Sequence, residues 1–160
     1  MADFLVRQGT QNTWIPTGTG STKLNITSLA ASAGKSGGAY DLGAEFSSLY
    51  SFKLTTKFGV APTKGTVVRV LLAWSDDNVD FAADQAGDDA VAEDELPQFH
   101  ELLPLVADDS TAVHRLFGFF RPMGRYVMPI IFNSADQSLS GTNGDHELTI
   151  TPLTGTAAVE

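Results

Sequence analysis

Hydrophobic and polar residues alternate most strictly over residues 50–58, where aromatic residues, leucine and threonine occupy every second position. A period of two with aromatic and β-branched residues predicts a strand with one buried face and one solvated face. A connection rich in turn-forming residues, 59–65, comes next. Residues 66–75 (TVVRVLLAWS) are apolar on both faces, which predicts a central strand. We expect these two strands to form a long antiparallel pair.

The strand pattern resumes nearer the C-terminus. Residues 113–121 (VHRLFGFFR) predict an aromatic strand, and residues 125–133 (RYVMPIIFN) predict another after a short turn. Pro129 has no backbone N–H to donate, which favours a sheet edge or a bulge at that position. Residues 146–153 (HELTITPL) follow a polar loop and predict a closing strand.

The N-terminal third gives a weaker pattern. Residues 4–8 and 23–29 are each a candidate strand, whereas the glycine-rich segments 17–22 and 34–38 predict flexible surface loops. A short helix within residues 82–92 is compatible with the sequence, although its acidic side chains would repel one another at a spacing of four residues.

The composition fits one globular domain. The chain has 160 residues, of which 42% are hydrophobic and 18% are charged, enough to fill a single core. About seven or eight strands without a separating linker predict an all-β fold, a single-domain antiparallel β-sandwich or jelly roll over residues 1–160. The chain has no cysteine, which excludes disulfides and thiolate metal sites. Because the chain has neither a signal-peptide pattern nor an apolar run of roughly 18 residues, we expect synthesis in a cytoplasm and no membrane partner.

Charge is concentrated in one segment. The net charge of −9 argues against sequence-independent binding to nucleic acid. Twelve of the 19 acidic residues fall between residues 76 and 109, and no lysine or arginine occurs over residues 70–114. We call residues 76–112 the acidic insertion. It is either a solvated loop extended by its own repulsion or a surface for a basic partner or cations. The candidate acidic surface consists of Asp76, Asp77, Asp80, Asp84, Asp88 and Asp89.

The acidic insertion also contains apolar residues, mostly in its second half. They are Phe81, Leu96, Phe99, Leu102, Leu103, Leu105 and Val106. These side chains predict that the second half packs back onto the body of the domain.

No residue pattern indicates catalysis. His100, His114 and His146 belong to no recognised nucleophile or metal-binding motif, and positions at strand ends or on the surface explain them. The acids lie in one loop, whereas a glycoside hydrolase would place a pair of them on strands lining a cleft. We therefore expect no enzymatic activity, no cofactor and no metal site.

Two short motifs resemble ligand loops and fail at defining positions. Residues 76–80 (DDNVD) resemble the first half of a calcium loop, but Phe81 replaces the turn glycine and Gly87 replaces the bidentate glutamate. Residues 34–36 (GKS) resemble the end of a phosphate-binding loop without its upstream glycines. Ordinary surface loops are the interpretation that these sequences favour.

Two further segments are candidates for partner contact. Trp74 ends an apolar strand face and is expected in the core. Trp14 lies between polar loops and is a candidate for exposure and for contact with carbohydrate or a protein partner. The N-terminal run is either the first strand of the protein's own sheet or an arm that adds a strand to a neighbour. Its candidate contact residues are Phe4, Leu5, Val6 and Arg7.

Residues 49–76, together with 124–133 and 145–152, resemble small β-sandwich structural proteins of tailed-bacteriophage virions, of the capsid decoration or cement type. The resemblance covers about half of the chain. It implies a non-enzymatic protein that binds the phage major capsid protein on the outer surface of the head and forms a homo-oligomer there. The resemblance also implies location in the virion, which is assembled in the host cytoplasm. A tail or head-fibre component stays open, and the acidic insertion departs from the pattern.

Other functional classes also stay open. A carbohydrate-binding, receptor-recognition module would use exposed aromatic residues, for which Trp14 and Phe81 are the candidates, together with the acidic loop. A glycan hydrolase is the weakest alternative, because none of the twelve acids stands out as catalytic. For a capsid protein we expect the acidic insertion to point outward, since buried apolar anchors contribute more affinity than charge.

Overall fold

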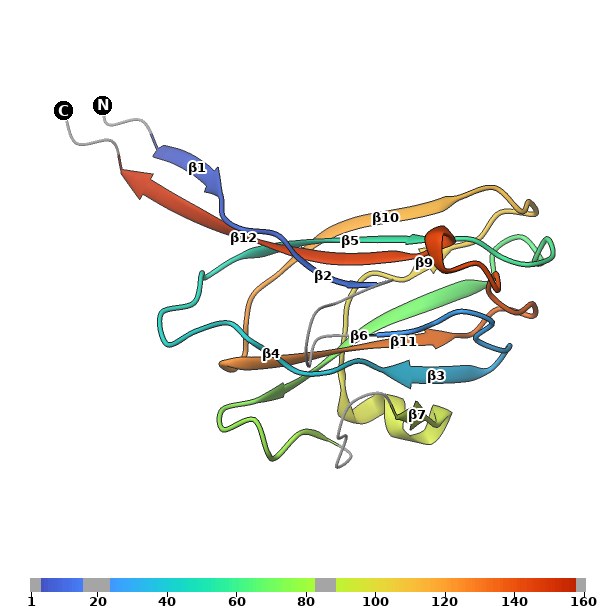
Figure 1. Cartoon of the computed structure of the whole chain (residues 1–160), viewed down its shortest axis with the longest axis horizontal. Coiled ribbons are helices and arrows are strands. Elements are labelled where there is room, and N and C mark those ends of the chain that lie inside the picture. The colour runs from blue at the N-terminus through green and yellow to red at the C-terminus, as the bar shows by residue number, and fades with distance from the viewer. Residues whose placement is uncertain (1–3, 16–23, 83–88, 158–160) are drawn as a thin grey trace.

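The computed structural model describes residues 4–15, 24–82 and 89–157. These residues form two antiparallel sheets packed face to face, so the predicted all-β sandwich is confirmed (Figure 1). The strands are β1 (Phe4–Gln8), β2 (Asn12–Ile15), β3 (Ala33–Ser36), β4 (Tyr40–Asp41), β5 (Tyr50–Thr56), β6 (Val67–Ser75), β7 (Ala90–Val91), β8 (His100–Glu101), β9 (Leu105–Val106), β10 (His114–Phe120), β11 (Tyr126–Asn133) and β12 (Glu147–Ala157). Two 3₁₀ helices lie wholly within the described residues, η3 (Glu93–Gln98) and η4 (Asn143–Asp145).

Each sheet has long strands at its centre. Sheet 1 has the order β1-β12-β5-β10, and β2 pairs with β12 beside β1. Sheet 2 has the order β7-β3-β11-β6-β8, and β4 and β9 pair with β11 and β6. The side chains of β5 alternate between buried and half-buried along the whole strand, as its sequence predicts. β6 lies between β11 and the short strands β8 and β9, which confirms its predicted central place.

The expected pairing of the strands now seen as β5 and β6 is wrong. β5 pairs with β10 and β12 in sheet 1, whereas β6 pairs with β11 in sheet 2, and residues 57–66 carry the chain between the sheets. β5 has one polar face, and β6 has two apolar faces. If β5 and β6 were neighbours in one sheet, the same outer face would carry the lysine of β5 and a leucine of β6. Covering that face would bury lysine, and leaving it open would expose leucine.

The main core lies between the two sheets. It contains Phe52 and Leu54 of β5, Leu72 of β6, and Ile150 of β12, all less than 4% exposed. A second cluster lies on the other side of sheet 2, where Leu71 of β6 and several residues of β11 meet the acidic insertion. The insertion contributes Phe81, Val91, Leu96 and Phe99 to this cluster. The expectation that its second half packs onto the body is confirmed, and this packing explains why both faces of β6 are apolar.

Pro129 was expected at an edge or a bulge, yet it lies in the central strand β11. On one side β11 pairs continuously with β6. On the other side β3 pairs with residues 130–133 and β4 with residues 126–127. Pro129 falls in the gap between them, where its carbonyl accepts a hydrogen bond from the Gly37 amide at 2.8 Å. Because Pro129 lies in the gap between β3 and β4, the N–H that proline lacks is not needed for strand pairing there.

The N-terminal half differs from its sequence pattern in two places. The described part of the candidate strand 23–29 contains a turn and no strand. The glycine-rich segment 34–38, expected to be a loop, instead contains most of strand β3. Gly34 fits closely between its neighbours, since a Cβ there would lie 2.7 Å from both the Phe132 ring and the Val91 carbonyl oxygen. Of the candidate helix 82–92, residues 83–88 lie outside the described residues, and Ala90–Val91 form β7.

Candidate partner-binding surface

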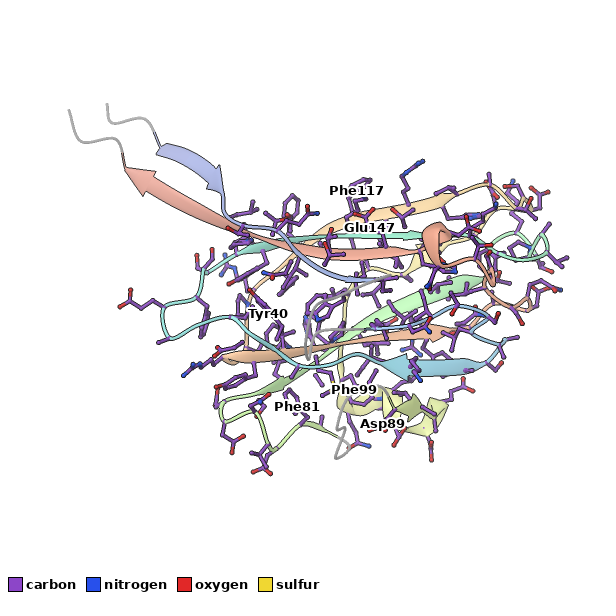
Figure 2. All side chains as sticks on the ribbon, viewed as in Figure 1. Tyr40, Phe81, Asp89, Phe99, Phe117 and Glu147 are labelled. Atoms are coloured by element: carbon purple, nitrogen blue, oxygen red, sulfur yellow. The ribbon has the colours of Figure 1, made fainter. Side chains whose placement is uncertain are left out.

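The two outer faces of the sandwich differ in their covering. Figure 2 shows Phe81 and Phe99 beneath sheet 2, where the acidic insertion covers the strands, and Phe117 on the opposite side, above sheet 1. We call the solvent-facing side of β2, β12, β5 and β10 the open face. Because the other outer face is covered by the protein's own insertion, the open face is, within the described residues, the broad sheet surface left for a partner.

Cross-strand pairing arranges the open face in rows. β10 and β12 flank β5 in register, so residues directly opposite each other share a side of the sheet. Each row begins with a residue of β10, continues with one of β5 and ends with one of β12. The three rows are Arg115–Thr55–Glu147, Phe117–Lys53–Thr149 and Phe119–Ser51–Thr151.

Two large aromatic side chains lie exposed on this face. Phe117 is 63% exposed and Phe119 is 68% exposed, whereas their neighbours Gly118 and Phe120 are buried. Single exposed apolar residues are common, but two adjacent aromatic rings with a polar surround are typical of an interaction surface. Arg115 and Arg121 are exposed at either end of the pair, and arginine is also enriched at interfaces.

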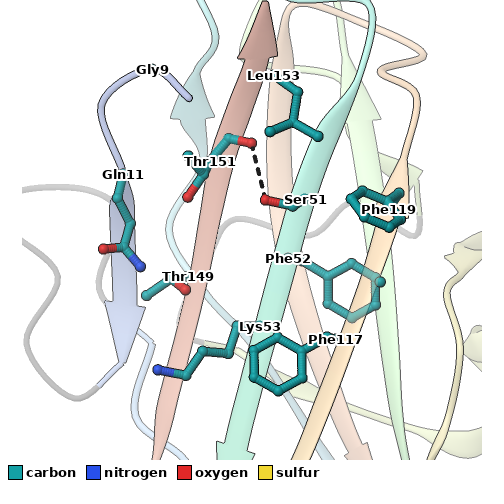
Figure 3. A pocket seen from close by; sticks show the side chains of 11 residues that line it. Gly9, Gln11, Ser51, Phe52, Lys53, Phe117, Phe119, Thr149, Thr151 and Leu153 are labelled. Atoms are coloured by element: carbon teal, nitrogen blue, oxygen red, sulfur yellow. Dashed lines mark hydrogen bonds between the residues drawn. The ribbon is translucent and has the colours of Figure 1, made fainter. Parts of the chain in front are cut away.

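A shallow groove of about 390 Å³ runs beside the two aromatic rings (Figure 3). Its lining residues are Gly9, Gln11, Ser51, Phe52, Lys53, Phe117, Gly118, Phe119, Thr149, Thr151 and Leu153. The Ser51 hydroxyl donates to the Thr151 carbonyl at 3.5 Å, and the Lys53 Nζ lies 2.5 Å from a carboxylate oxygen of Glu147. The groove therefore has an aromatic wall and a floor of hydroxyl, amide and ammonium groups.

Trp14 and Phe81, the aromatic candidates of the carbohydrate-binding alternative, are buried. Trp14 is 1% exposed and packs edge-on against Tyr40, with ring centroids 6.3 Å apart. The expectation that Trp14 faces a partner or a carbohydrate is thus wrong, because β2 pairs with β12 and directs this side chain into the sandwich. Phe81 is 7% exposed and belongs to the cluster beneath sheet 2. Trp74, expected in the core, is half-buried against it and contacts Phe120 at 5.9 Å.

The N-terminal candidate contacts lie in the protein's own sheet. β1 contains Phe4, Leu5, Val6 and Arg7, and these four residues pair with residues 154–157 of β12. The N-terminal run is therefore a strand of the protein's own sheet, the first of its two interpretations. Figure 1 shows the two-stranded ribbon of β1 and β12 extending beyond the sandwich. Contact of these four residues with a partner stays a prediction.

The candidate acidic surface is only partly within the described residues. Asp76, Asp77 and Asp80 are exposed, and Asp84 and Asp88 lie outside the described ranges. A carboxylate oxygen of Asp77 accepts hydrogen bonds from the backbone N–H groups of Val79 at 2.9 Å and Asp80 at 3.1 Å, and these bonds lower the pKa of Asp77. Asp77 therefore shapes a turn, the ordinary loop that the failed calcium motif favours.

Asp89 is exposed where the described chain resumes, and its backbone bonds to Ser36 of β3. Over the ranges 4–15, 24–82 and 89–157, no three histidine or acidic side chains come together as a set of metal ligands.

Two of the three histidines are more buried than strand ends usually are. His146 is 1% exposed and His114 is 8% exposed, while His100 is exposed. The Nε2 of His146 lies 2.9 Å from the Ser140 carbonyl oxygen, which can only accept, so Nε2 donates and Nδ1 accepts from the Thr56 hydroxyl at 2.9 Å. This satisfied, buried imidazole has a structural role in joining the end of β5 to the loop that precedes β12.

Sequence reasoning missed Phe117 and Phe119, although the signal was present. Alternation along VHRLFGFFR places both on the same side as Arg115 and Arg121. A strand face that carries two arginines points to solvent, and the phenylalanines between them must share that exposure.

Within the part of the chain that the structure describes, no helix is long and apolar enough to cross a membrane. No protein-family model matches the chain, and no curated protein sequence matches it.

Proposed function

We propose that this protein is a non-enzymatic structural component of a phage virion, a capsid decoration protein that attaches to the major capsid protein through the open face of sheet 1. The observation that carries the proposal is the exposed pair Phe117 and Phe119 on an uncovered sheet. Aromatic residues in a partner's pocket supply most of the affinity in protein interfaces. A rigid sheet also presents them without an ordering cost on binding.

The placement of charge supports the same orientation. The acidic insertion covers the outer face of sheet 2, on the side of the molecule away from Phe117. A protein docked by its open face would therefore point the insertion away from the shell. Negative charge at that position keeps decorated particles apart in solution.

The test is co-sedimentation of the purified protein with undecorated capsid shells at low and high salt. We expect saturable binding that survives high salt, because apolar contacts are screened little. The double variant Phe117→Ser/Phe119→Ser should lose binding, whereas Val60→Ser/Val79→Ser, which changes two exposed apolar residues away from the groove, should retain it. Absence of wild-type binding would overturn the capsid proposal, and full binding by the Phe117/Phe119 variant would exclude the open face.

The groove favours a second candidate, a carbohydrate-binding module of a tail or head fibre. An aromatic wall beside Ser51, Lys53 and Thr151 matches the apolar face and polar edges of a sugar ring. Titration with soluble host-surface oligosaccharides separates the candidates, because it needs no shell. Binding lost in Phe117→Ser and weakened in Ser51→Ala would support this module, and no binding at millimolar sugar would exclude it.

A further inference from the structure

The edges of the two sheets are protected unequally. Both edges of sheet 2 consist of two-residue strands, β7 on one side and β8 and β9 on the other. β10 forms an edge of sheet 1 and is seven residues long. Among the described residues β5 is the strand that pairs with it, and its other side has no paired neighbour. Natural sheets rarely leave such an edge open, because its free N–H and C=O groups pair readily with another strand.

β10 also has few of the features that keep edge strands apart, and Arg115 is its one lysine or arginine side chain. Proline, lysine and β-bulges usually prevent edge-to-edge pairing. The sequence HRLFGFF has no proline or lysine, and its pairing with β5 runs through all seven residues without a register shift. Phe117 and Phe119 add exposed apolar surface to the same strand. The strand is thus suited to main-chain pairing with another strand.

The sequence of β10 is complementary to itself. An antiparallel pair of two β10 strands overlaps over all seven residues when its two-fold axis passes through the midpoint, Phe117. That register places Phe117 against its own copy and Arg115 against Phe119, a cation–π combination. It also places Leu116 against Gly118. Moving the axis by one residue, to Gly118, would place Arg115 against Arg121, which is unfavourable because like charges would face each other.

We propose that two copies of this chain join through antiparallel pairing of their β10 strands about a two-fold axis at Phe117. Sheet 1 then becomes one sheet continuous across the dimer, and the open faces merge into a surface with four exposed phenylalanines. The merged surface rests on the proposed function, since it gives a capsid two linked contacts in place of one. The dimer itself is tested in solution without shells.

The first measurement is the mass of the purified protein by sedimentation equilibrium over a concentration series. We expect a monomer–dimer equilibrium. Phe117→Lys and Phe117→Glu should each weaken dimerisation roughly tenfold or more, because each places two like charges across the axis and removes an aromatic pair. Both changes are at a 63% exposed position, and unchanged far-ultraviolet circular dichroism would confirm that the variants fold.

Mixing the variants tests the register. An equimolar mixture of Phe117→Lys and Phe117→Glu should recover a heterodimer, because opposite charges then face each other. The matched control is Phe119→Glu alone, which should remain dimeric since position 119 faces Arg115. A wild-type protein that stays monomeric up to roughly 1 mM would overturn the proposal, as would a mixture that does not recover the dimer. A dimer that forms normally but does not bind shells would contradict the proposed function alone.

Discussion

Phe52 and Gly118 lie directly opposite each other on β5 and β10, and the phenylalanine ring fills the space on the core side of the glycine. A Cβ at position 118 would lie 2.4 Å from Cε1 of Phe52. The glycine therefore lets the buried ring lie flat under β10, between the two residues whose rings point outward. The exposed pair is held by a packed core directly beneath it.

Replacement Gly118→Ala should lower the free energy of unfolding by about 1–3 kcal/mol, because the added methyl group would displace the Phe52 ring. Urea denaturation followed by tryptophan fluorescence measures the change. Gly144→Ala is the matched control, since no atom lies within 4 Å of a Cβ at that position. Equal stability of the two variants would contradict the close packing at position 118.

Phe119 and Phe120 are neighbours with opposite environments, 68% and 4% exposed. Phe120→Ala should cost about 3–5 kcal/mol of stability, because its ring packs against Tyr50 with centroids 5.5 Å apart. Phe119→Ala should change stability by less than about 0.5 kcal/mol. The melting temperatures of the two variants, measured at one low protein concentration, test this difference in stability. A large loss in Phe119→Ala would mean that this ring is a core residue.

The acidic insertion should be an integral part of the fold. Leu96 is 2% exposed beneath sheet 2, and Leu96→Ala should destabilise by about 2–5 kcal/mol. Hydrogen exchange should then speed up across residues 89–107. Leu103→Ala, at a 58% exposed position in the same segment, is the control and should leave exchange unchanged. Unaltered protection in Leu96→Ala would show that the insertion does not depend on this contact.

Stability should fall as the pH drops below about 6.5. Burial lowers the pKa of His146 below its ordinary value of 6.5, so on acidification the unfolded chain takes up a proton before the folded protein does. The contribution of this histidine is thus complete above pH 6.5 and is lost progressively on acidification. Urea midpoints measured at several pH values between 5 and 7.5 give the slope of stability against pH. His146→Gln should reduce the slope, and an unchanged slope would contradict this role of His146.

The sequence predicts the fold class because its long strands show their buried faces directly. Alternation located β5, β10 and β12 to within a few residues, and in β5 and β10 every second side chain is at least partly exposed. Alternation says nothing about which strands pair, and the proximity in sequence of β5 and β6 suggested a pair that the structure divides between the sheets. The sequence did not predict β3, because glycine usually indicates a loop. Gly34 is instead a strand residue whose close packing leaves no room for a side chain.

The candidate site was harder to predict than the fold. Exposure of Trp14 was inferred from its polar neighbours, but burial depends on pairing with β12, more than 130 residues further along the chain. The converse error concerned Phe117 and Phe119. Aromatic residues within a strand suggest a core, although their alternation with Arg115 and Arg121 marks this face as solvated.

The ribbon formed by β1 and β12 has a mechanical consequence. Phe4 pairs with Ala157 at its outer end, and Gln8 pairs with Leu153 near the sandwich. A pulling force applied to both strands at the outer end would therefore open the pairs in sequence, as a zipper does, instead of shearing them all at once. The ribbon would yield at low force and lengthen the molecule, while the sandwich behind it stayed folded.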